Sequence, residues 1–373
     1  MNILVIGGAG YIGSHIVYEL NDAGHRVTIL DNFSTGLREN VDARATLVEG
    51  DMQDLNLLNR LLSSGKDSEK NVTGTVNETT TGKSTITTTE TAAGAETAAS
   101  TGTASGISAS IEPFDSVFHF AALKAAGESM QEPEKFTRAN TIATLNLLNV
   151  MMEHGIKNFV FSSSAATYGE PEYLPIDEKH PQKPINYYGY TKLAIEQTLR
   201  WYSQLKGLRY AALRYFNAAG YDVQGRITGK EQNPANLLPI VMEVAAGTRA
   251  KMQVFGDDYP TRDGTCIRDY IHVNDLATAH VKAMEYLASE DRDLELNLAT
   301  GEGYTVLEVI QEAEQVSGRP VPHDITGRRP GDPAELVAAS SQALETIGWK
   351  AQHSSLQTLI ESTWNVYRDE QAG

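Results

Sequence analysis

Tyr188 and Lys192 lie four residues apart, and their types and spacing could support proton transfer. On a helix, this spacing places both side chains on one face. A nearby ammonium favours the ionised form of a phenol, whose ordinary pKa is about 10, and so helps the phenol to accept a proton near neutral pH. The same spacing also occurs on ordinary surface helices. The pair alone therefore leaves both interpretations open.

A glycine-rich turn near the N-terminus gives this pair a context. The turn follows an apolar run, Ile3–Ile6, and consists of Gly7, Gly8, Ala9, Gly10, Tyr11, Ile12 and Gly13. A helical pattern comes next, and Asp31 ends the following apolar run, as a dinucleotide-binding fingerprint requires. Glycines let the backbone approach a pyrophosphate at a helix N-terminus, and the acid accepts hydrogen bonds from ribose hydroxyls and repels a 2′-phosphate. The pattern predicts NAD rather than NADP; the alternative is a tight turn without a ligand.

Strand-like and helix-like segments alternate through the first half of the chain. Expected strands are Ile3–Ile6, Arg26–Leu30, Leu47–Glu49, Val117–Phe120, Asn158–Ser162 and Tyr210–Leu213, and expected helices are Ile12–Leu20, Thr141–Met152 and Leu193–Leu205. After Tyr215, helices are expected at Leu237–Ala246, Val273–Leu287 and Val306–Val316, with short strands at Gln253–Phe255 and Glu295–Leu298. This order predicts an α/β fold, with a Rossmann-like doubly wound parallel sheet in residues 1–215. Residues 216–373 are expected to form a smaller C-terminal α/β substrate domain, partly interleaved with the first.

Residues 63–111 break the alternation. They are rich in Thr, Ser, Ala, Gly and Glu and contain hardly any large apolar residue, so they cannot form a core of their own. This insertion joins a helix to the amino end of a strand, whereas ligands of such folds bind at the carboxyl ends of strands. We therefore expect the insertion to lie away from the chemistry, and its removal to leave turnover nearly intact.

The charge and the cysteine and histidine content of the chain limit the classes of molecule that it is expected to bind. The formal net charge of −17 argues against nucleic acid or an anionic membrane as the main partner. The single cysteine, Cys266, excludes an intrachain disulfide, and the N-terminus has no basic region of the kind that opens a signal peptide. We expect a cytoplasmic protein. No metal site is predicted, because the nine histidines are scattered without ligand-like spacing, and His119 is expected to be packed in a strand.

Several short runs now carry a family likeness. The glycine turn, Ser162-Ser163-Ser164 after a strand, and the Tyr188–Lys192 pair together resemble the extended short-chain dehydrogenase/reductase family. More specifically, the chain is similar to members that act on nucleotide sugars. The supporting runs are Phe120–Lys124, Ser162–Gly169, Arg214–Asn217, Arg268–Val273 and Arg328–Asp332. The likeness covers nearly the whole chain except the insertion.

The resemblance implies a bound NAD and chemistry at C4 of a UDP-sugar, with interconversion of UDP-glucose and UDP-galactose through a 4-keto sugar that rotates in the site. Tyr188 would take the proton of the 4-hydroxyl, Ser164 would hydrogen-bond the reacting oxygen, and Lys192 would hold the nicotinamide ribose and lower the pKa of the tyrosine. Without the family context, Ser164 could equally be a loop or cap serine, and Lys192 an ordinary solvated lysine.

The resemblance also implies two sets of binding residues. It further implies a homodimer, formed through the helices expected at Thr141–Met152 and Leu193–Leu205. The NAD set adds Asn32, Asp51, Met52, Phe120, Ala121, Lys124, Asn140 and Tyr215 to Gly7, Gly10, Tyr11, Ile12, Gly13, Asp31, Tyr188 and Lys192. The sugar-nucleotide set is Ser164, Asn217, Asn236, Leu237, Phe255, Arg268, Arg329 and Asp332. Arginines suit a diphosphate because guanidinium binds phosphate in a fork. Phe255 could flank the uracil or belong to the core.

The chain departs from the family pattern at two positions, and three alternative functions remain open. Ala122 stands where many relatives have glycine, and Leu336 has an intermediate size where relatives vary beside the sugar, so UDP-N-acetylglucosamine or a UDP-uronate remains an alternative substrate. A dehydratase or decarboxylase is a second rival, but relatives that dehydrate carry an Asp-Glu pair where this chain has Ala165-Ala166. A non-catalytic NAD-binding regulator is the third, because a fold alone does not prove activity.

Overall fold

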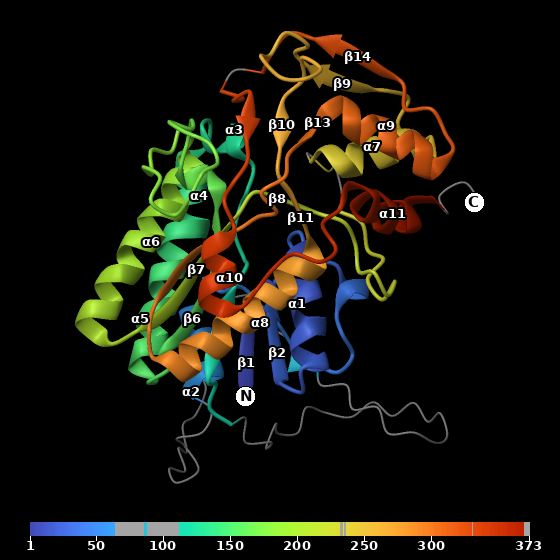
Figure 1. The fold of residues 1–373 in the computed structure, drawn as a ribbon. Coiled ribbons are helices and arrows are strands. Elements are labelled where there is room, and N and C mark those ends of the chain that lie inside the picture. The colour runs from blue at the N-terminus through green and yellow to red at the C-terminus, as the bar shows by residue number, and fades with distance from the viewer. Residues whose placement is uncertain (64–85, 88–111, 232–233, 235, 330, 369–373) are drawn as a thin grey trace, which may run out of the picture.

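The computed structural model describes residues 1–63, 86–87, 112–231, 234, 236–329 and 331–368 (Figure 1). The predictions for the rest of the insertion therefore lie outside the described residues. At its described end, the side-chain amide of Asn2 donates a hydrogen bond to the carbonyl oxygen of Glu112 at 2.6 Å. The segment before residue 116 thus returns at the amino end of the first strand, and the glycine turn lies at that strand's carboxyl end.

A large sheet forms the centre of the fold. Its order is β12-β7-β6-β5-β1-β2-β3-β4, and every neighbouring pair is parallel except β3 with β4. The strands are β1 (Asn2–Ile6), β2 (Arg26–Asp31), β3 (Thr46–Glu49), β4 (Ile86–Thr87), β5 (Ser116–His119), β6 (Asn158–Ser164), β7 (Arg209–Tyr215) and β12 (Leu294–Leu298). The predicted Rossmann-like parallel sheet is confirmed. The chain order reverses between β1 and β5, which is where such sheets bind their ligands.

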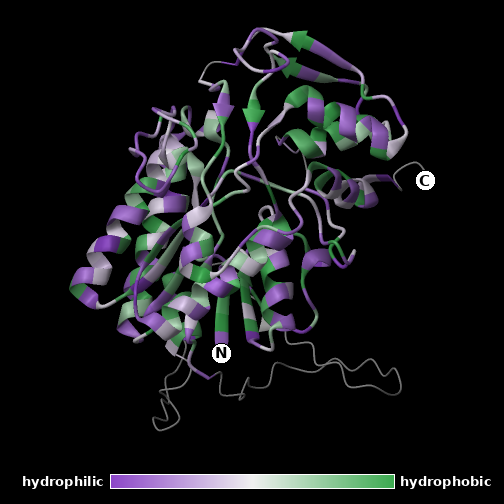
Figure 2. Cartoon of the chain, in the orientation of Figure 1, coloured by the Kyte–Doolittle hydropathy of each residue, from purple (hydrophilic) through white to green (hydrophobic). Residues whose placement is uncertain are grey.

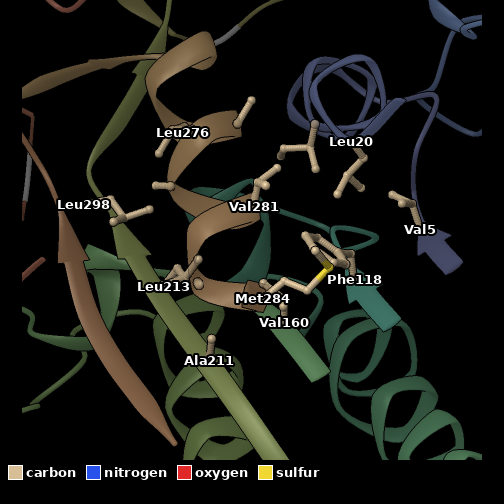
Figure 3. Close-up of a cluster of buried hydrophobic side chains, with 14 of the residues drawn as sticks. Val5, Leu20, Phe118, Val160, Ala211, Leu213, Leu276, Val281, Met284 and Leu298 are labelled. Carbon is tan, nitrogen blue, oxygen red and sulfur yellow. The ribbon is translucent and has the colours of Figure 1, made fainter. Parts of the chain in front are cut away.

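Helices cover both faces of this sheet because its strands are apolar on both sides. One face packs on α1 (Tyr11–Asp22), α8 (Val273–Glu290) and α10 (Ser341–Ile347), and the other on α2 (Leu55–Ser63), α5 (Ala143–Glu153) and α6 (Tyr187–Lys206). Figure 3 shows the first of these cores, where Met284 of α8 lies beside Phe118 of β5. The sheet therefore holds its carboxyl edge rigidly.

A smaller region sits above that edge in Figure 1. Its core is made by α7 (Leu237–Ala246), α9 (Val306–Ser317) and α11 (Leu356–Tyr367). Short strands complete it: β8 (Asn217–Ala219) pairs with β11 (Tyr270–His272), β9 (Met252–Phe255) with β14 (His323–Thr326), and β10 (Ile267–Arg268) with β13 (Tyr304–Thr305) and β15 (Glu335–Leu336). Figure 2 shows apolar residues concentrated where these layers face one another. Because β12 and α8 return to the large sheet, the two regions are interleaved in sequence.

Some boundaries differ from the predicted ones. Helix α6 begins at Tyr187 rather than Leu193, because the side chain of Asn186 accepts a hydrogen bond from the backbone N–H of Gly189 at 2.8 Å and caps the helix. The helix expected at Thr141–Met152 is divided between a π-turn, η2 (Thr137–Ile142), and α5. The short elements α3 (Ala126–Ser129), α4 (Pro133–Phe136), η1 (Arg38–Asn40) and η3 (Ala165–Thr167) were not predicted. In the described part of the chain, no helix has the length and apolar character needed to cross a membrane.

Candidate active site

The glycine turn forms a cradle between β1 and α1. Gly7 has φ +80°, and a Cβ there would lie 2.7 Å from the backbone nitrogen of Ala121. A Cβ on Gly13 would lie only 2.1 Å from the carbonyl oxygen of Gly7. Side chains are therefore excluded, and the N-terminal turn of α1, with Tyr11 and Ile12, opens directly at the strand end. A backbone this bare at a helix N-terminus fits the pyrophosphate of a dinucleotide.

Asp31 ends the neighbouring strand, as predicted. Its two carboxylate oxygens accept hydrogen bonds from the backbone N–H groups of Ala9 at 2.9 Å and Phe33 at 2.8 Å. Burial raises the pKa of Asp31, and these two hydrogen bonds oppose the rise. Beside it, the side-chain amide of Asn32 donates to Asp51 at 3.0 Å. Met52 is buried just behind them, so the predicted ribose end of the NAD site is assembled in one place.

The opposite wall of the cradle is the loop after β5, which contains Phe120 and Ala121. Asn140 holds this loop, because its side chain accepts from the N–H of Leu123 at 2.9 Å and donates to the same residue's carbonyl at 3.0 Å. Lys124, the predicted pyrophosphate partner, forms an ion pair with Glu231 from the smaller region. Glu231 carries no motif, so sequence reasoning missed it. The ion pair places a carboxylate against the lysine that the NAD prediction requires.

Tyr188, Lys192 and Ser164 come together at the junction of α6 and the end of β6. The hydroxyl of Ser164 is hydrogen-bonded with Tyr188 and also accepts from the N–H of Ala166 at 3.2 Å. Ser164 therefore caps the turn that follows β6 and also lies beside the Tyr188 phenol, so a cap serine and a site serine are here the same residue. Lys192 is 2% exposed, and its ammonium donates to the carbonyl of Ser162 at 2.7 Å. The interpretation of Lys192 as a solvated lysine is wrong.

The protonation of this pair differs from the prediction. Burial raises the pKa of Tyr188 above its ordinary value of 10.0, and the hydrogen bond with Ser164 opposes the rise. Burial lowers the pKa of Lys192 to about 7, against the attraction of the Glu196 carboxylate. The Lys192 ammonium lies 5.9 Å from the centre of the Tyr188 ring. We predicted that Lys192 lowers the pKa of Tyr188, but in this geometry desolvation dominates for both groups.

A cavity of about 680 Å³ lies in the smaller region. Seven of the eight predicted sugar-nucleotide residues line it, namely Asn217, Asn236, Leu237, Phe255, Arg268, Arg329 and Asp332. The eighth, Ser164, lies with Tyr188. The guanidinium of Arg329 sits 4.3 Å from the centre of the Phe255 ring, and Arg268 lies 3.4 Å from a carboxylate oxygen of Asp332. Phe255 is half-buried at the cavity wall.

One extended segment connects this cavity with the NAD cradle. Tyr215, the last residue of β7, is buried, and its hydroxyl is hydrogen-bonded with that of Ser162. Asn217 begins β8 two residues later, and its side chain donates to the carbonyl of Asp269 at 2.9 Å. The serine–tyrosine–lysine group therefore lies between a dinucleotide cradle and a cationic cavity. Such an arrangement can remove a proton from a ligand that both sites hold.

A family model described as NAD dependent epimerase/dehydratase family matches residues 3–69 and 56–299. The chain belongs to this family. The match confirms the resemblance, and NAD is the cofactor for which the glycine cradle, Asp31 and Lys192 are suited.

Similar epimerases cover the full length of the chain. The UDP-glucose 4-epimerase of Halalkalibacterium halodurans is 42% identical over 100% of this chain and 97% of that protein. The corresponding enzyme of Corynebacterium glutamicum is 40% identical over 98% of this chain and 95% of that protein. Among solved structures, the UDP-glucose 4-epimerase from Brucella ovis in complex with NAD has a TM-score of 0.83 and 38% identity, covering 98% of both chains. The UDP-glucose 4-epimerase from Bifidobacterium longum in complex with NAD+ and UDP has a TM-score of 0.81 and 34% identity, covering 100% of both chains.

Several residues around this epimerase/dehydratase site were not predicted. Arg249, Lys251, Cys266 and Tyr270 also line the cavity, and burial raises the pKa of the Cys266 thiol. They flank the predicted residues in sequence, but no motif distinguishes them from ordinary strand and loop residues. In the described ranges, no group of three His, Cys, Asp or Glu side chains gathers in a way that could hold a metal ion.

Proposed function

We propose that this chain interconverts UDP-glucose and UDP-galactose by oxidation and reduction at C4 of the sugar. One observation carries the proposal: Ser164, Tyr188 and Lys192 meet at the junction of a dinucleotide cradle and a cavity lined by paired arginines. The close likeness to proteins named UDP-glucose 4-epimerase supports the same substrate pair.

In the proposed reaction, the phenol oxygen of Tyr188 accepts the proton of the sugar 4-hydroxyl and later returns it. Ser164, hydrogen-bonded with Tyr188, holds the reacting oxygen in line with the phenol. NAD, when bound, would supply the redox chemistry at C4 of the sugar. The ammonium of Lys192 orients the nicotinamide ribose, and its charge, when present, opposes the desolvation that raises the pKa of Tyr188. The burial of these groups keeps water away from the keto sugar.

The cavity residues hold the rest of the substrate. Arg329 can offer a forked pair of N–H donors to the diphosphate, and Arg268, whose Nη1 already donates to the carbonyls of Ile267 and Pro333, adds positive charge beside it. Phe255 offers a ring face to the uracil, next to Arg329, and Asp332 can accept from a ribose hydroxyl. The 4-keto sugar, attached only through C1, is then free to turn its other face while the nucleotide stays anchored.

A dehydration is disfavoured by the residues that follow Ser164. They are Ala165 and Ala166, which form a 3-10 turn and cannot move a proton. Elimination across the sugar requires an additional acid and base close to C5 and C6. We therefore propose net epimerisation.

The test is to incubate the purified protein with UDP-galactose and to follow UDP-glucose by proton NMR. The variant Tyr188→Phe deletes the proton acceptor and keeps the ring, so turnover should fall by about 100-fold or more, the usual scale for general acid–base catalysis. Calorimetric binding of UDP should survive in that variant. Absence of the product from the wild-type protein, or near-normal turnover by Tyr188→Phe, would refute the proposal.

We also propose a homodimer, in the cytoplasm, with α5 and α6 at its interface. Trp201 and Leu205 lie one turn apart on α6 and are 62% and 70% exposed. Ile142, at the start of the neighbouring α5 segment, is also exposed. Exposed large apolar side chains on two adjacent helices are typical of a protein interface.

A further inference from the structure

The end of β6 is connected to three successive turns of α6. Ser164 is hydrogen-bonded with Tyr188, and the carbonyl of Ser162 accepts from Lys192. The third connection is new: the hydroxyl of Ser163 donates to the carboxylate of Glu196 at 2.5 Å. Tyr188, Lys192 and Glu196 are spaced four residues apart, so they lie along one face of the helix. The residue after the catalytic pair on this face is therefore a buried carboxylate.

Glu196 is fully buried and accepts four hydrogen bonds. Besides Ser163, the donors are Nε of Arg214 at 2.9 Å, Nη2 of Arg214 at 2.6 Å, and the side-chain amide of Gln182 at 2.9 Å. Arg214 is itself 1% exposed and donates a further hydrogen bond to Glu295 at 2.7 Å. A buried carboxylate is tolerated only when its oxygens are satisfied in this way. These four bonds fix the side chain in one position, and with it the third turn of α6.

The surroundings of Lys192 contain little else that could stabilise its charge. Its ammonium lies 4.8 Å from the centre of the Phe161 ring and contacts one carbonyl, and none of the described carboxylates forms an ion pair with it. Across the sheet, His119 is buried, and burial lowers its pKa to about 3, so it contributes no charge. Tyr188 and Tyr215 face the same space as uncharged phenols, because burial raises the pKa of each.

The charges behind the pair favour a positive Lys192. Glu196 attracts the ammonium, and Arg214, which would repel it, is neutralised by a second carboxylate, Glu295. Two carboxylates thus face two arginines, Arg214 and Arg200, and the lysine. Arg200 pairs with Glu295 at 2.6 Å and lies 3.7 Å from a carboxylate oxygen of Glu196.

We propose that Glu196 is a positioning residue for the reaction, which holds the third turn of α6 against Ser163 and keeps Lys192 protonated beside Tyr188. This inference rests on the proposed function, because it concerns the base and the lysine of that site. Glu196 itself touches neither the cavity nor the glycine cradle. It acts on the reaction only through Lys192 and through the strand end that carries Ser164.

The first test measures the ionisation of Lys192 directly. The full chain is labelled at the lysine ε-carbons, each signal is followed by NMR against pH, and Lys192 is assigned by the loss of its signal in Lys192→Met. In Glu196→Gln, the pH at which half of the Lys192 side chains are protonated (the midpoint) should fall by about one unit, a typical effect of a nearby buried charge. Glu295→Gln is the matched control: it removes an equal charge, but one that pairs with the far side of Arg214, so the pH midpoint of Lys192 should fall by clearly less than in Glu196→Gln. An unchanged midpoint in Glu196→Gln would overturn the electrostatic part of the inference.

The second test separates this role from a general loss of structure. If Lys192 ionises near pH 7, a fall of about one unit reduces its charged fraction about twofold at pH 6 and about tenfold at pH 8. The kcat of Glu196→Gln should therefore show a deficit that grows with pH, whereas a purely structural defect lowers kcat by the same factor throughout. The KM for the UDP-sugar should change less than twofold. A deficit independent of pH would contradict the inference.

Ser163→Ala provides a milder variant in case Glu196→Gln fails to fold. It removes only the hydroxyl that holds Glu196 to β6 and changes no charge. We expect kcat to fall severalfold with the Lys192 midpoint unchanged, and an unchanged kcat would refute the positioning role. The NMR titration needs no turnover, so a protein that proves inactive on UDP-galactose would disprove the proposed function without deciding this inference.

Discussion

Replacing Gly13 by alanine tests the claim that the NAD cradle depends on contact between backbone atoms. The added Cβ would lie 2.1 Å from the carbonyl oxygen of Gly7 and 3.0 Å from the Cα of Gly8. Because both neighbours are backbone, the start of α1 must move away from the turn by about 1 Å, and overpacking of this kind costs about 1–3 kcal/mol. At 1.4 kcal/mol for each tenfold change, NAD should bind about 5- to 150-fold more weakly.

The assay compares two glycine variants. Protein stripped of nucleotide is titrated with NAD by calorimetry, and its thermal unfolding is measured without ligand. Gly13→Ala should lower both the affinity and the Tm, because the clash lies within the protein. Gly10→Ala is the control: its Cβ would meet only the Gly7 oxygen, at 3.3 Å, so Tm should hardly change while NAD binding weakens through direct contact with the ligand. If Gly13→Ala keeps wild-type Tm and affinity, the close-contact reasoning is wrong.

Three further predictions concern other parts of the chain. Glu231→Gln removes the ion-pair partner of Lys124, so calorimetry should show NAD binding up to about fivefold more tightly, the scale of a partly exposed pair, while Lys124→Met should weaken binding; no change in either variant would mean that Lys124 does not bind NAD. His119 is neutral in the fold because burial lowers its pKa to about 3, so below pH 6.5 the unfolded chain binds more protons than the folded chain. The free energy of unfolding therefore decreases as the pH is lowered, by about 2 kcal/mol from this group between pH 7 and pH 5. Urea unfolding of His119→Gln should not show this part of the decrease. An identical pH dependence in the variant would contradict this account. Trp201→Glu should give a monomer by light scattering, whereas Leu344→Glu, exposed on α10, should not; a dimer that persists in Trp201→Glu would move the interface elsewhere.

Much of the fold could be predicted because its local signals agree. The strand before the glycine turn, the helix after it and the acid at the next strand end were all placed correctly by residue type and period alone. The start of α6 was missed because its first turn, from Tyr187, is rich in aromatic and polar residues, and only the capping contact of Asn186 reveals it. The smaller sheets were largely missed, since strands such as β8 and β10 have two or three residues and depend on partners far along the chain.

In the site, too, local sequence showed some features, whereas others depend on tertiary contacts. Types and spacing predicted the Tyr188–Lys192 pair, and the family resemblance added Ser164, but the charge states of the pair depend on burial, which the sequence does not show. The predicted direction of the Tyr188 pKa shift therefore differed from the structure. Glu231 and Glu196 were missed because each acts through a partner from a distant segment, Lys124 for the first and Ser163 for the second. Long-range ion pairs and buried carboxylates follow from tertiary contacts.

The passage from β7 into β8 has a consequence for engineering. Tyr215 and Asn217 belong to the two halves of the site, yet only about 6–7 Å of extended backbone separates them. A chimera that takes its sugar-nucleotide half from another epimerase cannot be joined here with a linker, because one inserted residue would turn the asparagine to the opposite side of the chain. Grafts of that half should keep residues 214–218 from a single parent and place the crossover farther along, beyond β8.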